Sequence, residues 1–537
     1  MSEGLVLVGL PGSGKSEVGR CVADRLGRPF IDLDAEIART SGASPAEHIR
    51  RSGEAAFRRL EQAALLDACG VSGAVIATGG GTSLDPLNRW MLAEHGIRVR
   101  LDAPVDTLVE RLARDPAERP LLGDDPAAGL RRTAARRAAV YAAVDGTVDA
   151  ASTPDTVAEE IVRLHAASSA VDAAWRPLYD APFARHHPIG APTGRLLFGR
   201  GVDGRAIEAA LGAAVQREPV VVADRRALQA QPQLAAALPP TRRFIVDGGE
   251  AAKSFGALER LLAWLSEVEA ERRDVLLAAG GGTIGDVGGL AAALHRRGMP
   301  LAHVPTTWLA QADSSIGGKV AIDLPNAKNA VGAFWPPTLI LADFDLLQTL
   351  PAPRRRDGLA ECLKAGLIGD SELWRLVEER GAGALAGSDR AAGYAISERA
   401  ARLKLAIVER DPYEAGERRL LNLGHTLGHA LEVESAYRLP HGEAVGLGLL
   451  AVAAIAARRG AEAGLAQRIE SVLHALGFPL RRRFDRALVR AALGSDKKRE
   501  RGTQRWLLPI AVGRVEEVTD VSAAELELAL DRIWAPA

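Results

Sequence analysis

"LVLVGLPGSGKS", residues 5–16, decides how the first part of the chain folds. Its opening apolar residues predict a buried strand, and "EVGRCVADRL" at 17–26 predicts a helix directly after the loop. Gly9–Ser16 between them fits G-x-x-x-x-G-K-[ST], a pattern whose backbone N–H groups surround nucleotide phosphates. The stretch therefore predicts a parallel α/β domain that binds a nucleotide. The residues expected to contact the nucleotide or its magnesium ion are Gly12, Ser13, Gly14, Lys15 and Ser16.

The overall composition is that of an ordinary soluble globular protein. Hydrophobic residues make up 47% of the 537 residues, charged residues make up 25%, and the formal net charge is −1. The near-zero charge gives no indication of a nucleic-acid partner. Cys21, Cys69 and Cys362 are far apart in sequence, which argues against disulfides and against a thiolate zinc site. Without a signal peptide or a long apolar run, the chain is expected in the cytoplasm.

The chain is too long for one core, and its patterning predicts an α/β fold in several domains. Residues 1–168 alternate short apolar runs with helical stretches, as in a parallel-sheet domain. Residues 169–190 lose this periodicity and are the predicted linker. A second α/β part is expected at 191–350, with strands at "PVVVAD", "RRFIVDGG", "DVLLAAGGG", "LAHVPTT" and "TLILADFDLL". Residues 351–537 read as an all-α part.

Lysine is scarce in this chain. Only eight of the 67 basic residues are lysines, so 59 are arginines. Lysines that persist in so arginine-rich a chain are candidates for positions that need a compact ammonium rather than a planar guanidinium. A few surface lysines would persist by chance, but most of these eight fall inside glycine- or histidine-rich motifs. They are Lys15, Lys253, Lys319, Lys328, Lys364, Lys404, Lys497 and Lys498.

Several polar residues of the first domain could bind the phosphate acceptor. Asp32 and Asp34 in "FIDLDAEI" follow a second strand, at the sheet edge where ligands bind in open α/β folds. They could order a magnesium shell and orient an acceptor hydroxyl. Each arginine nearby, taken alone, is more often a solvated surface residue. The further candidates are Arg58, Gly79, Gly80, Gly81, Arg119 and Arg137.

The second half contains a weak dinucleotide pattern. Gly280–Gly285 fits G-x-G-x-x-G between a strand and a helix, but no acidic residue lies between Val287 and Ala312, where the ordinary fingerprint needs one. Asp224, at the end of "PVVVAD", is a better candidate for contact with an adenosine ribose. The segment "VPTTWLAQADSSIGGKVAIDLPNAKNAVGAFWPP" is rich in hydroxyls, glycines and lysine, which suits a phosphorylated, polyhydroxylated ligand.

Three histidines lie close together in "LNLGHTLGHALEVESAYRLPHGEAVG", residues 421–446. His425 and His429 share a helix face at i, i+4, and His441 follows after a short connection. Three such histidines with neighbouring glycines favour metal binding over simple core packing. The local sequence cannot choose among them or identify a carboxylate, although Glu443 is nearest. Glu361 and Lys364, at i, i+3, would by themselves be a surface ion pair.

The first domain resembles shikimate kinase over nearly its whole length. The shared order is phosphate loop, D-x-D, F-R-x-x-E, G-G-G, R-P-L-L and R-x-x-x-Y. The resemblance implies that Asp34 holds the acceptor hydroxyls, that Arg58 and Arg137 clamp its carboxylate, and that Arg119 closes over the ATP phosphates. It also places Ser16 and Asp32 at the magnesium ion. Gly79, Gly80 and Gly81 would line the shikimate site. Glu17 departs from the family, which often has a hydroxyl residue there.

Residues from about 190 to 510 resemble 3-dehydroquinate synthase. The shared motifs, in order, are G-E-x-x-K, G-G-G-x-x-G-D, P-T-T, D-S-S-x-G-G-K, K-N-x-x-G-x-F, A-E-x-x-K, L-N-x-G-H-T-x-G-H-A, H-G-E and D-K-K. The resemblance implies that Glu361, His425 and His441 bind one zinc or cobalt ion, while His429 handles substrate and protons. The residues implied for NAD are Asp224, Glu250, Lys253, Gly281, Gly282, Asp286, Thr306, Thr307, Asp313, Lys319 and Lys328. Those implied for the heptulosonate phosphate are Arg297, Lys319, Lys328, Asn329, Lys364, Lys404, Arg418, Asn422, His429 and Lys498.

Together the two resemblances predict a bifunctional enzyme of aromatic amino acid (chorismate) biosynthesis. One half would phosphorylate shikimate with Mg-ATP, and the other would convert 3-deoxy-D-arabino-heptulosonate 7-phosphate to 3-dehydroquinate and phosphate. The family also implies a homodimer through the second half. The residues expected to act in catalysis are Lys15, Asp34, Arg119, Lys319, Arg418, Asn422 and His429. The alternatives are a gluconate-type kinase, another sugar-phosphate cyclase, a metal-dependent polyol dehydrogenase and a degenerate nucleotide-sensing protein.

Overall fold

The structure is a computed structural model of the chain. It describes residues 4–114, 122, 125–142, 144–169, 175–181, 194–211, 217–324, 327–495 and 504–535. These residues form two compact units, and the boundary between the units falls within β6 (Trp175–Ala181). Arg119 and Lys498, both predicted to bind ligands, lie outside the described residues.

The first unit is built on a parallel sheet. Among the described residues it has five strands in the order β2-β3-β1-β4-β5. Their bounds are β1 Gly4–Val8, β2 Phe30–Asp32, β3 Val75–Ala77, β4 Gly96–Asp102 and β5 Gly146–Asp149. The helices are α1 Lys15–Leu26, α2 Leu33–Ser41, α3 Pro45–Cys69, α4 Pro86–His95, α5 Val105–Ala113, α6 Pro126–Ala142 and α7 Pro154–Ser169, with the 3-10 turn η1 at Thr82–Leu84.

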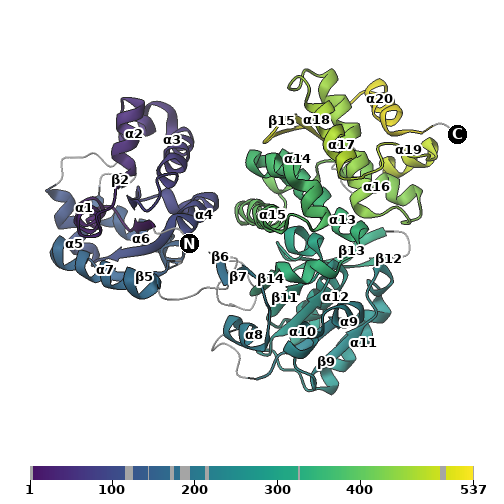
Figure 1. Cartoon of the computed structure of the whole chain (residues 1–537), viewed down its shortest axis with the longest axis horizontal. Coiled ribbons are helices and arrows are strands. Elements are labelled where there is room, and N and C mark those ends of the chain that lie inside the picture. Colours follow the sequence, from purple (N-terminus) through teal and green to yellow (C-terminus); the bar gives the residue numbers. More distant parts are fainter. Residues whose placement is uncertain are drawn as a thin grey trace. The chain divides into compact units, whose positions relative to one another are not determined.

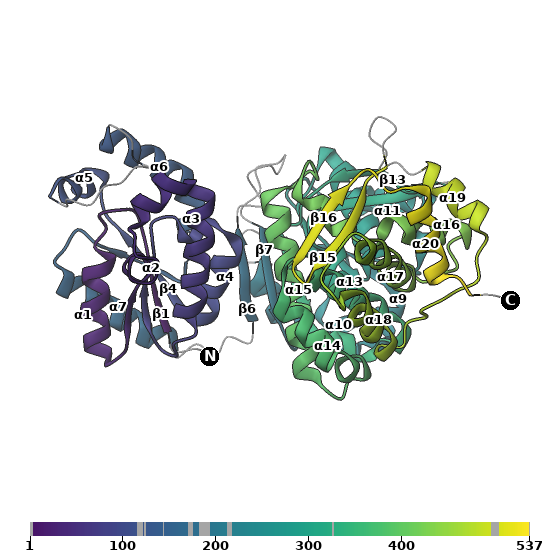
Figure 2. The same ribbon diagram turned by 90° about the horizontal axis from the view of Figure 1, so that it is seen from above.

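Helices cover both faces of this sheet, which explains why β1 is apolar at every position. Successive side chains of a strand point to opposite faces. Leu5 and Leu7 pack with residues of α1 and α7, while Val6 and Val8 pack with residues of α2 and α3. Figure 2 shows β1 and β4 between α1 and α7 on one side and α3 and α4 on the other. The predicted parallel α/β domain is confirmed.

The second unit begins with another mainly parallel sheet. In its described part, seven strands lie in the order β6-β7-β14-β11-β10-β8-β9. The strands are β7 Gly194–Gly199, β8 Val220–Asp224, β9 Arg243–Val246, β10 Leu276–Gly280, β11 Leu301–Pro305 and β14 Leu339–Asp343. The helices here are α8 Gly204–Leu211, α9 Arg225–Ala230, α10 Pro232–Ala237, α11 Phe255–Glu267 and α12 Gly282–Leu294. The short turns are η5 Glu250–Ala252, η6 His295–Arg297, η7 Ala310–Ser314 and η8 Phe344–Thr349.

All of the strands expected in this part are present. Val220 and Val222 of β8 face one hydrophobic cluster and Val221 and Ala223 face another, so this strand too is buried on both sides. An antiparallel hairpin of β12 (Lys319–Leu324) and β13 (Ala327–Phe334) projects from the polar segment after β11. Figure 1 shows this hairpin beside α12. The hairpin carries two of the scarce lysines.

The remainder of the second unit is helical, as predicted. Its helices are α13 Ala352–Gly369, α14 Ser371–Ala386, α15 Arg390–Arg410, α16 His425–Glu434, α17 His441–Arg458, α18 Leu465–Ala475, α19 Arg486–Ser495 and α20 Ala523–Ile533, with η9 at Glu417–Asn422. A small hairpin of β15 (Trp506–Ala511) and β16 (Arg514–Val518) adds strands that sequence patterning missed. In the described residues α17 alone is long and apolar enough to span a membrane, but 72% of it is buried in the protein. It is the central helix of this part.

Candidate active sites

The phosphate-binding loop of the first unit is formed as the sequence predicts. It joins β1 to α1, and Gly12 and Gly14 adopt positive φ values of 82° and 84°. Glycine tolerates this conformation, and no side chain caps the first amides of α1, so they face the loop as phosphate donors. The Lys15 ammonium donates to the carbonyl oxygens of Gly9 and Leu10, at 3.0 Å each. The lysine is thereby held over the loop.

One cavity of about 1080 Å³ brings the predicted kinase residues together. Phosphate-loop residues form one part of its wall, and acidic, basic and glycine residues from β2, α2, α3, the turn after β3 and α6 form another. The predicted residues that line it are Gly12, Ser13, Gly14, Lys15, Ser16, Asp32, Asp34, Arg58, Gly79, Gly80, Gly81 and Arg137. A cavity of this size can hold a nucleotide and a small acceptor together.

Arg58 is held in this cavity by two carboxylates. It donates to Glu61 at 2.7 Å and to Glu54 at 2.9 Å. Burial lowers the pKa of Arg58, but the charge and hydrogen bonds of these glutamates outweigh it and raise the pKa. Glu61 is itself fully buried and also accepts a bond of 2.7 Å from the Thr82 hydroxyl. Glu61 was not among the predicted site residues, although it is the last residue of the motif F-R-x-x-E.

Short backbone segments position the other acceptor-side groups. Asp32 caps α2, because its carboxylate accepts from the Ala35 amide at 3.2 Å, so one of its oxygens is committed to structure. Arg137 donates to the carbonyl oxygen of Gly80, and the Tyr141 hydroxyl donates to the same oxygen at 2.5 Å. These bonds tie α6 to the glycine turn after β3.

In the second unit, three helices bring a carboxylate and two imidazoles together. Glu361 lies in the middle of α13, while His425 and His441 are the first residues of α16 and α17. One ligand atom from each side chain lies within 4.8 Å of the others. Glu361 Oε1 is 3.5 Å from His425 Nε2 and 3.3 Å from His441 Nε2. This is the set of ligands that the sequence implied.

The surroundings of this cluster suit a divalent ion. Glu361 is 3% exposed; its Oε2 pairs with the Lys364 ammonium, and its Oε1 faces both histidines. Burial would raise the pKa of Glu361, but Lys364 and His441 lower it, so the carboxylate is charged. Burial likewise would lower the pKa of His441, but Glu361 and Glu432 raise it to about 10. One carboxylate and two imidazoles can hold zinc and leave positions for substrate.

His429 and Glu443 lie outside this ligand group. The ring of His429 is 5.2 Å from that of His425 and 6.4 Å from that of His441, measured between centroids. It therefore borders the cluster, where a substrate-handling group would lie. Glu443, the carboxylate nearest in sequence, instead pairs with Arg356 at 2.9 Å.

The residues expected to bind NAD follow the carboxyl ends of the parallel strands, where such folds bind their ligands. Gly281 and Gly282 follow β10, and a β-carbon on either would lie within 3.0 Å of Thr307 or Ser314. Thr306 and Thr307 follow β11, while Glu250 and Lys253 follow β9. Asp224 ends β8 and caps α9 by accepting from the Arg226 amide.

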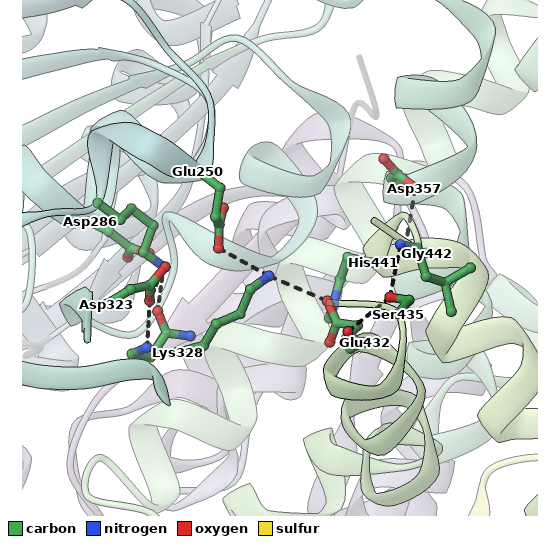
Figure 3. Close-up of polar contacts among 12 residues, drawn as sticks. Glu250, Asp286, Asp323, Lys328, Asp357, Glu432, Ser435, His441 and Gly442 are labelled. Carbon is green, nitrogen blue, oxygen red and sulfur yellow. Dashed lines mark hydrogen bonds and ion pairs between the residues drawn. The ribbon is translucent and has the colours of Figure 1, made fainter. Parts of the chain in front are cut away.

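A group of charged residues connects this edge to the helical part (Figure 3). Lys253 pairs with Asp286 at 2.8 Å and also contacts Asn329. Burial raises the pKa of Asp286 to about 6, although Lys253 opposes the shift. Lys328 of β13 lies between Glu250 at 3.1 Å and Glu432 at 3.5 Å.

The remaining predicted cations have protein partners. Lys319 pairs with Glu414, which also accepts from Asn422 at 2.8 Å. Lys404 pairs with Asp313 at 2.7 Å, and Lys364 donates to the Leu421 carbonyl at 2.6 Å in addition to its pair with Glu361.

Arg418 and Arg297 are placed less favourably for the predicted substrate contacts. The Arg418 side chain is buried and donates to the carbonyl oxygens of Gly317 and Pro412, so it braces the loop before β12. Arg297 is exposed and lies beyond the far end of α12 from Gly282. At 1.5 Å per residue, the 13-residue helix separates these ends by about 20 Å. A contact between Arg297 and this site within one chain is not supported.

Family models match both units. Residues 11–165 match "Shikimate kinase", residues 243–357 match "3-dehydroquinate synthase N-terminal", and residues 358–499 match "3-dehydroquinate synthase C-terminal". The matched regions contain the predicted site residues described above, except Asp224.

Relatives and a solved structure are similar to a part of this chain. The 3-dehydroquinate synthase of Symbiobacterium thermophilum is 40% identical over 297 residues, which cover 55% of this chain and 83% of that protein. The 3-dehydroquinate synthase of Bradyrhizobium diazoefficiens is 38% identical over 349 residues, covering 60% and 90%. A 2-epi-5-epi-valiolone synthase from Streptomyces hygroscopicus, solved with NAD+ and Zn2+ bound, is 30% identical with a TM-score of 0.59, covering 63% and 96%. The chain therefore belongs to the 3-dehydroquinate synthase family and carries a shikimate kinase domain ahead of its synthase part.

Proposed function

We propose that the chain catalyses two steps of aromatic amino acid biosynthesis, one in each unit. The first unit phosphorylates shikimate with ATP, and the second converts 3-deoxy-D-arabino-heptulosonate 7-phosphate to 3-dehydroquinate and phosphate. The observation that carries the second assignment is the buried cluster of Glu361, His425 and His441 beside the glycine-rich edge of a parallel sheet. For the first, it is the cavity that joins the phosphate loop to two arginines and two aspartates.

In the kinase, the loop amides and Lys15 hold the ATP phosphates, and Ser16 and Asp32 hold the magnesium ion that accompanies them. Asp34 accepts the proton of the acceptor hydroxyl. Arg58 and Arg137 bind the shikimate carboxylate from opposite helices, α3 and α6. Arg58 reaches the carboxylate in a fixed direction because Glu61 and Glu54 hold its guanidinium.

In the synthase, Glu361, His425 and His441 bind one zinc or cobalt ion. This ion would polarise a substrate hydroxyl as a Lewis acid, and NAD would take up and return a hydride. The solved valiolone synthase, which holds NAD+ and Zn2+, supports both cofactors. Gly281 and Gly282 let the turn after β10 pack against Thr307 and Ser314, and the start of α12 in this turn would offer backbone amides to the dinucleotide pyrophosphate.

Around these cofactors, the protein side chains bind, orient and move protons. Lys319, Lys404 and Lys364 offer ammonium groups to the substrate phosphate and carboxylate, each at present paired with Glu414, Asp313 or Glu361. Substrate anions would compete with these carboxylates. His429, beside the metal histidines but outside the ligand group, carries the proton between substrate and solvent.

The assembly, location and domain limits are also proposals. We infer domains at 1–168, 191–350 and 351–537, a cytoplasmic enzyme, and a homodimer formed through the second unit. Light scattering on the purified chain would measure the oligomer directly.

Two assays test the function. Under anaerobic conditions, the chain with substoichiometric NAD should release phosphate from the heptulosonate phosphate over many turnovers. With Mg-ATP it should phosphorylate shikimate. Stoichiometric NADH accumulation without phosphate release would identify a polyol dehydrogenase instead. Phosphorylation of gluconate but not shikimate would overturn the kinase assignment.

A further inference from the structure

The two metal-site histidines each have a protein partner on the ring nitrogen that faces away from the metal site. His425 Nδ1 lies 3.1 Å from the carbonyl oxygen of Leu423, and His441 Nδ1 lies 3.5 Å from Glu432 Oε1. Carbonyl and carboxylate oxygens accept but do not donate, so each contact would hold the ring proton on Nδ1 once Nε2 binds an ion. Each Nε2 faces Glu361, the third proposed ligand, so the two rings present Nε2 to the same place.

Glu432 is an unusual residue for its position. It lies on α16, is 3% exposed, and none of the predicted site roles includes it. A buried carboxylate is costly unless cations or donors compensate it. Two groups from other elements do so here: Lys328 of β13 and His441 of α17 both approach Glu432 Oε1 at 3.5 Å (Figure 3). Lys328 also lies 4.7 Å from the ring centre of Tyr437.

The backbone around Glu432 is fixed by the turn that joins α16 to α17. The Glu432 carbonyl oxygen accepts from the Tyr437 amide at 2.7 Å and from the Ser435 hydroxyl at 2.8 Å. Ala436 and Tyr437 have φ values of 49° and 59°, which are strained for residues other than glycine. Strain of this kind persists only where the surroundings impose it.

The other end of the turn is fixed as well. The Gly442 amide, next to His441, donates to Asp357 of α13 at 3.2 Å. α13 is the helix that carries Glu361, so this bond sets the start of α17 relative to the third ligand (Figure 3). Glu432 and His441 are therefore held at a defined separation, nine residues apart in sequence.

We propose that Glu432 is a positioning residue of the metal site: its carboxylate orients His441 through Nδ1, and Lys328 in turn holds the carboxylate. The proposal rests on the metal site proposed above. Second-layer carboxylates of this kind fix the tautomer and ring orientation of a ligating histidine and make it a stronger ligand. Glu432 does not touch the substrate or the ion in this role.

The test is the affinity of the full chain for Co2+ alone, without NAD or substrate. Wild type should bind one ion per chain, with the absorption spectrum of histidine-ligated Co2+, and His441→Ala should abolish this binding. Glu432→Ala should weaken binding roughly 10- to 100-fold, as second-layer mutations usually do. Glu432→Gln should weaken it by about threefold or more but less than alanine, because an amide oxygen still accepts from Nδ1 but carries no charge.

Glu434→Ala is the matched control. Glu434 lies on the same helix and pairs with Arg482 and the Asp485 amide, away from the ligands. This variant removes a paired carboxylate from the same helix and should leave Co2+ affinity unchanged. The melting temperature of the second unit shows whether each variant is folded, because shikimate phosphorylation by the first unit would not depend on it.

The outcomes separate the two proposals. If wild type binds no Co2+, the proposed metal site fails. If wild type binds and both Glu432 variants bind within about twofold of it, the positioning role is wrong and the carboxylate only supports the fold. If Glu432→Ala does not fold, Glu432→Gln decides alone.

Discussion

Gly81 lies against the guanidinium of Arg58, which makes Gly81→Ala a selective test of the shikimate site. A β-carbon at Gly81 would be 2.2 Å from Arg58 Nη2 and 2.6 Å from Cζ. Ordinary contact needs about 3.5 Å, so the guanidinium must retreat by more than about 1 Å. Gly81 has a φ of −115°, which alanine adopts without strain, so the damage is confined to the side-chain clash.

The cost follows from what Arg58 loses. Moving it sacrifices at least one charged hydrogen bond, to Glu61 or to the substrate carboxylate, worth about 1.5–3 kcal/mol. At about 1.4 kcal/mol per factor of ten, kcat/KM for shikimate should fall roughly ten- to hundredfold. Initial rates of ADP formation at varied shikimate would measure this fall, and KM for ATP should stay constant.

Gly80→Ala gives a matched comparison in the same turn. Its β-carbon would lie 3.4 Å from Pro11 and Arg137, an ordinary contact, so its loss should be smaller. Synthase activity of the same protein checks the preparation. If kcat/KM for shikimate in Gly81→Ala stays within about twofold of wild type, or if KM for ATP rises equally, Arg58 does not bind the acceptor as described.

Four further outcomes follow. Treatment with a chelator should abolish dehydroquinate formation, whereas shikimate phosphorylation should return once magnesium is restored. The reason is that the metal-ligand cluster found among the described residues lies in the second unit. Equal loss of both activities would contradict this. Lys319→Arg should lower synthase activity by about an order of magnitude, because a planar guanidinium cannot replace a compact ammonium. Near-normal rates would show that the retention of lysine at this position in an arginine-rich chain is a coincidence. Burial lowers the pKa of Lys404 to about 8, although the charge of Asp313 opposes this shift. The Lys404 side chain is therefore a cation below about pH 8 and neutral above it. Synthase kcat/KM should therefore decline above about pH 8, with no such decline in a Lys404→Arg variant. Cutting the chain near Ala173 should give two soluble fragments, each within a few-fold of its activity in the intact protein; an inactive or insoluble fragment would show that the units depend on each other.

Sequence patterns were sufficient where all residues of a site lie in one loop or one turn of a helix. The phosphate loop needs only glycines, a lysine and a strand–helix setting, so residues 5–16 were sufficient to predict it. The three metal ligands needed more, because the spacing of the histidines could not identify Glu361, which lies on another helix. The family motif supplied that residue.

Contacts between elements were beyond sequence patterning. Glu432 meets His441 only because a strained turn folds α17 back onto α16, and nothing in "HALEVE" marks that carboxylate as buried. Arg297 shows a similar limit: the resemblance implied a substrate contact for it, but α12 carries it about 20 Å from Gly282. Glu61 is the last residue of the motif F-R-x-x-E, but only the structure shows that it is fully buried and pairs with Arg58.

β6, Trp175–Ala181, lies within the segment predicted to be a linker and is the end strand of the larger sheet, beside β7. The outer strand of a sheet has backbone N–H and C=O groups that can pair with a strand of another chain, and natural proteins often prevent this with proline. β6 contains Pro177, which has no backbone N–H to donate to a strand of another chain. A synthase fragment that starts after Ala181 would expose β7 instead and should aggregate, whereas one that keeps β6 should not. The stretch between the two enzymes thus also limits edge-to-edge strand pairing between sheets of the second unit.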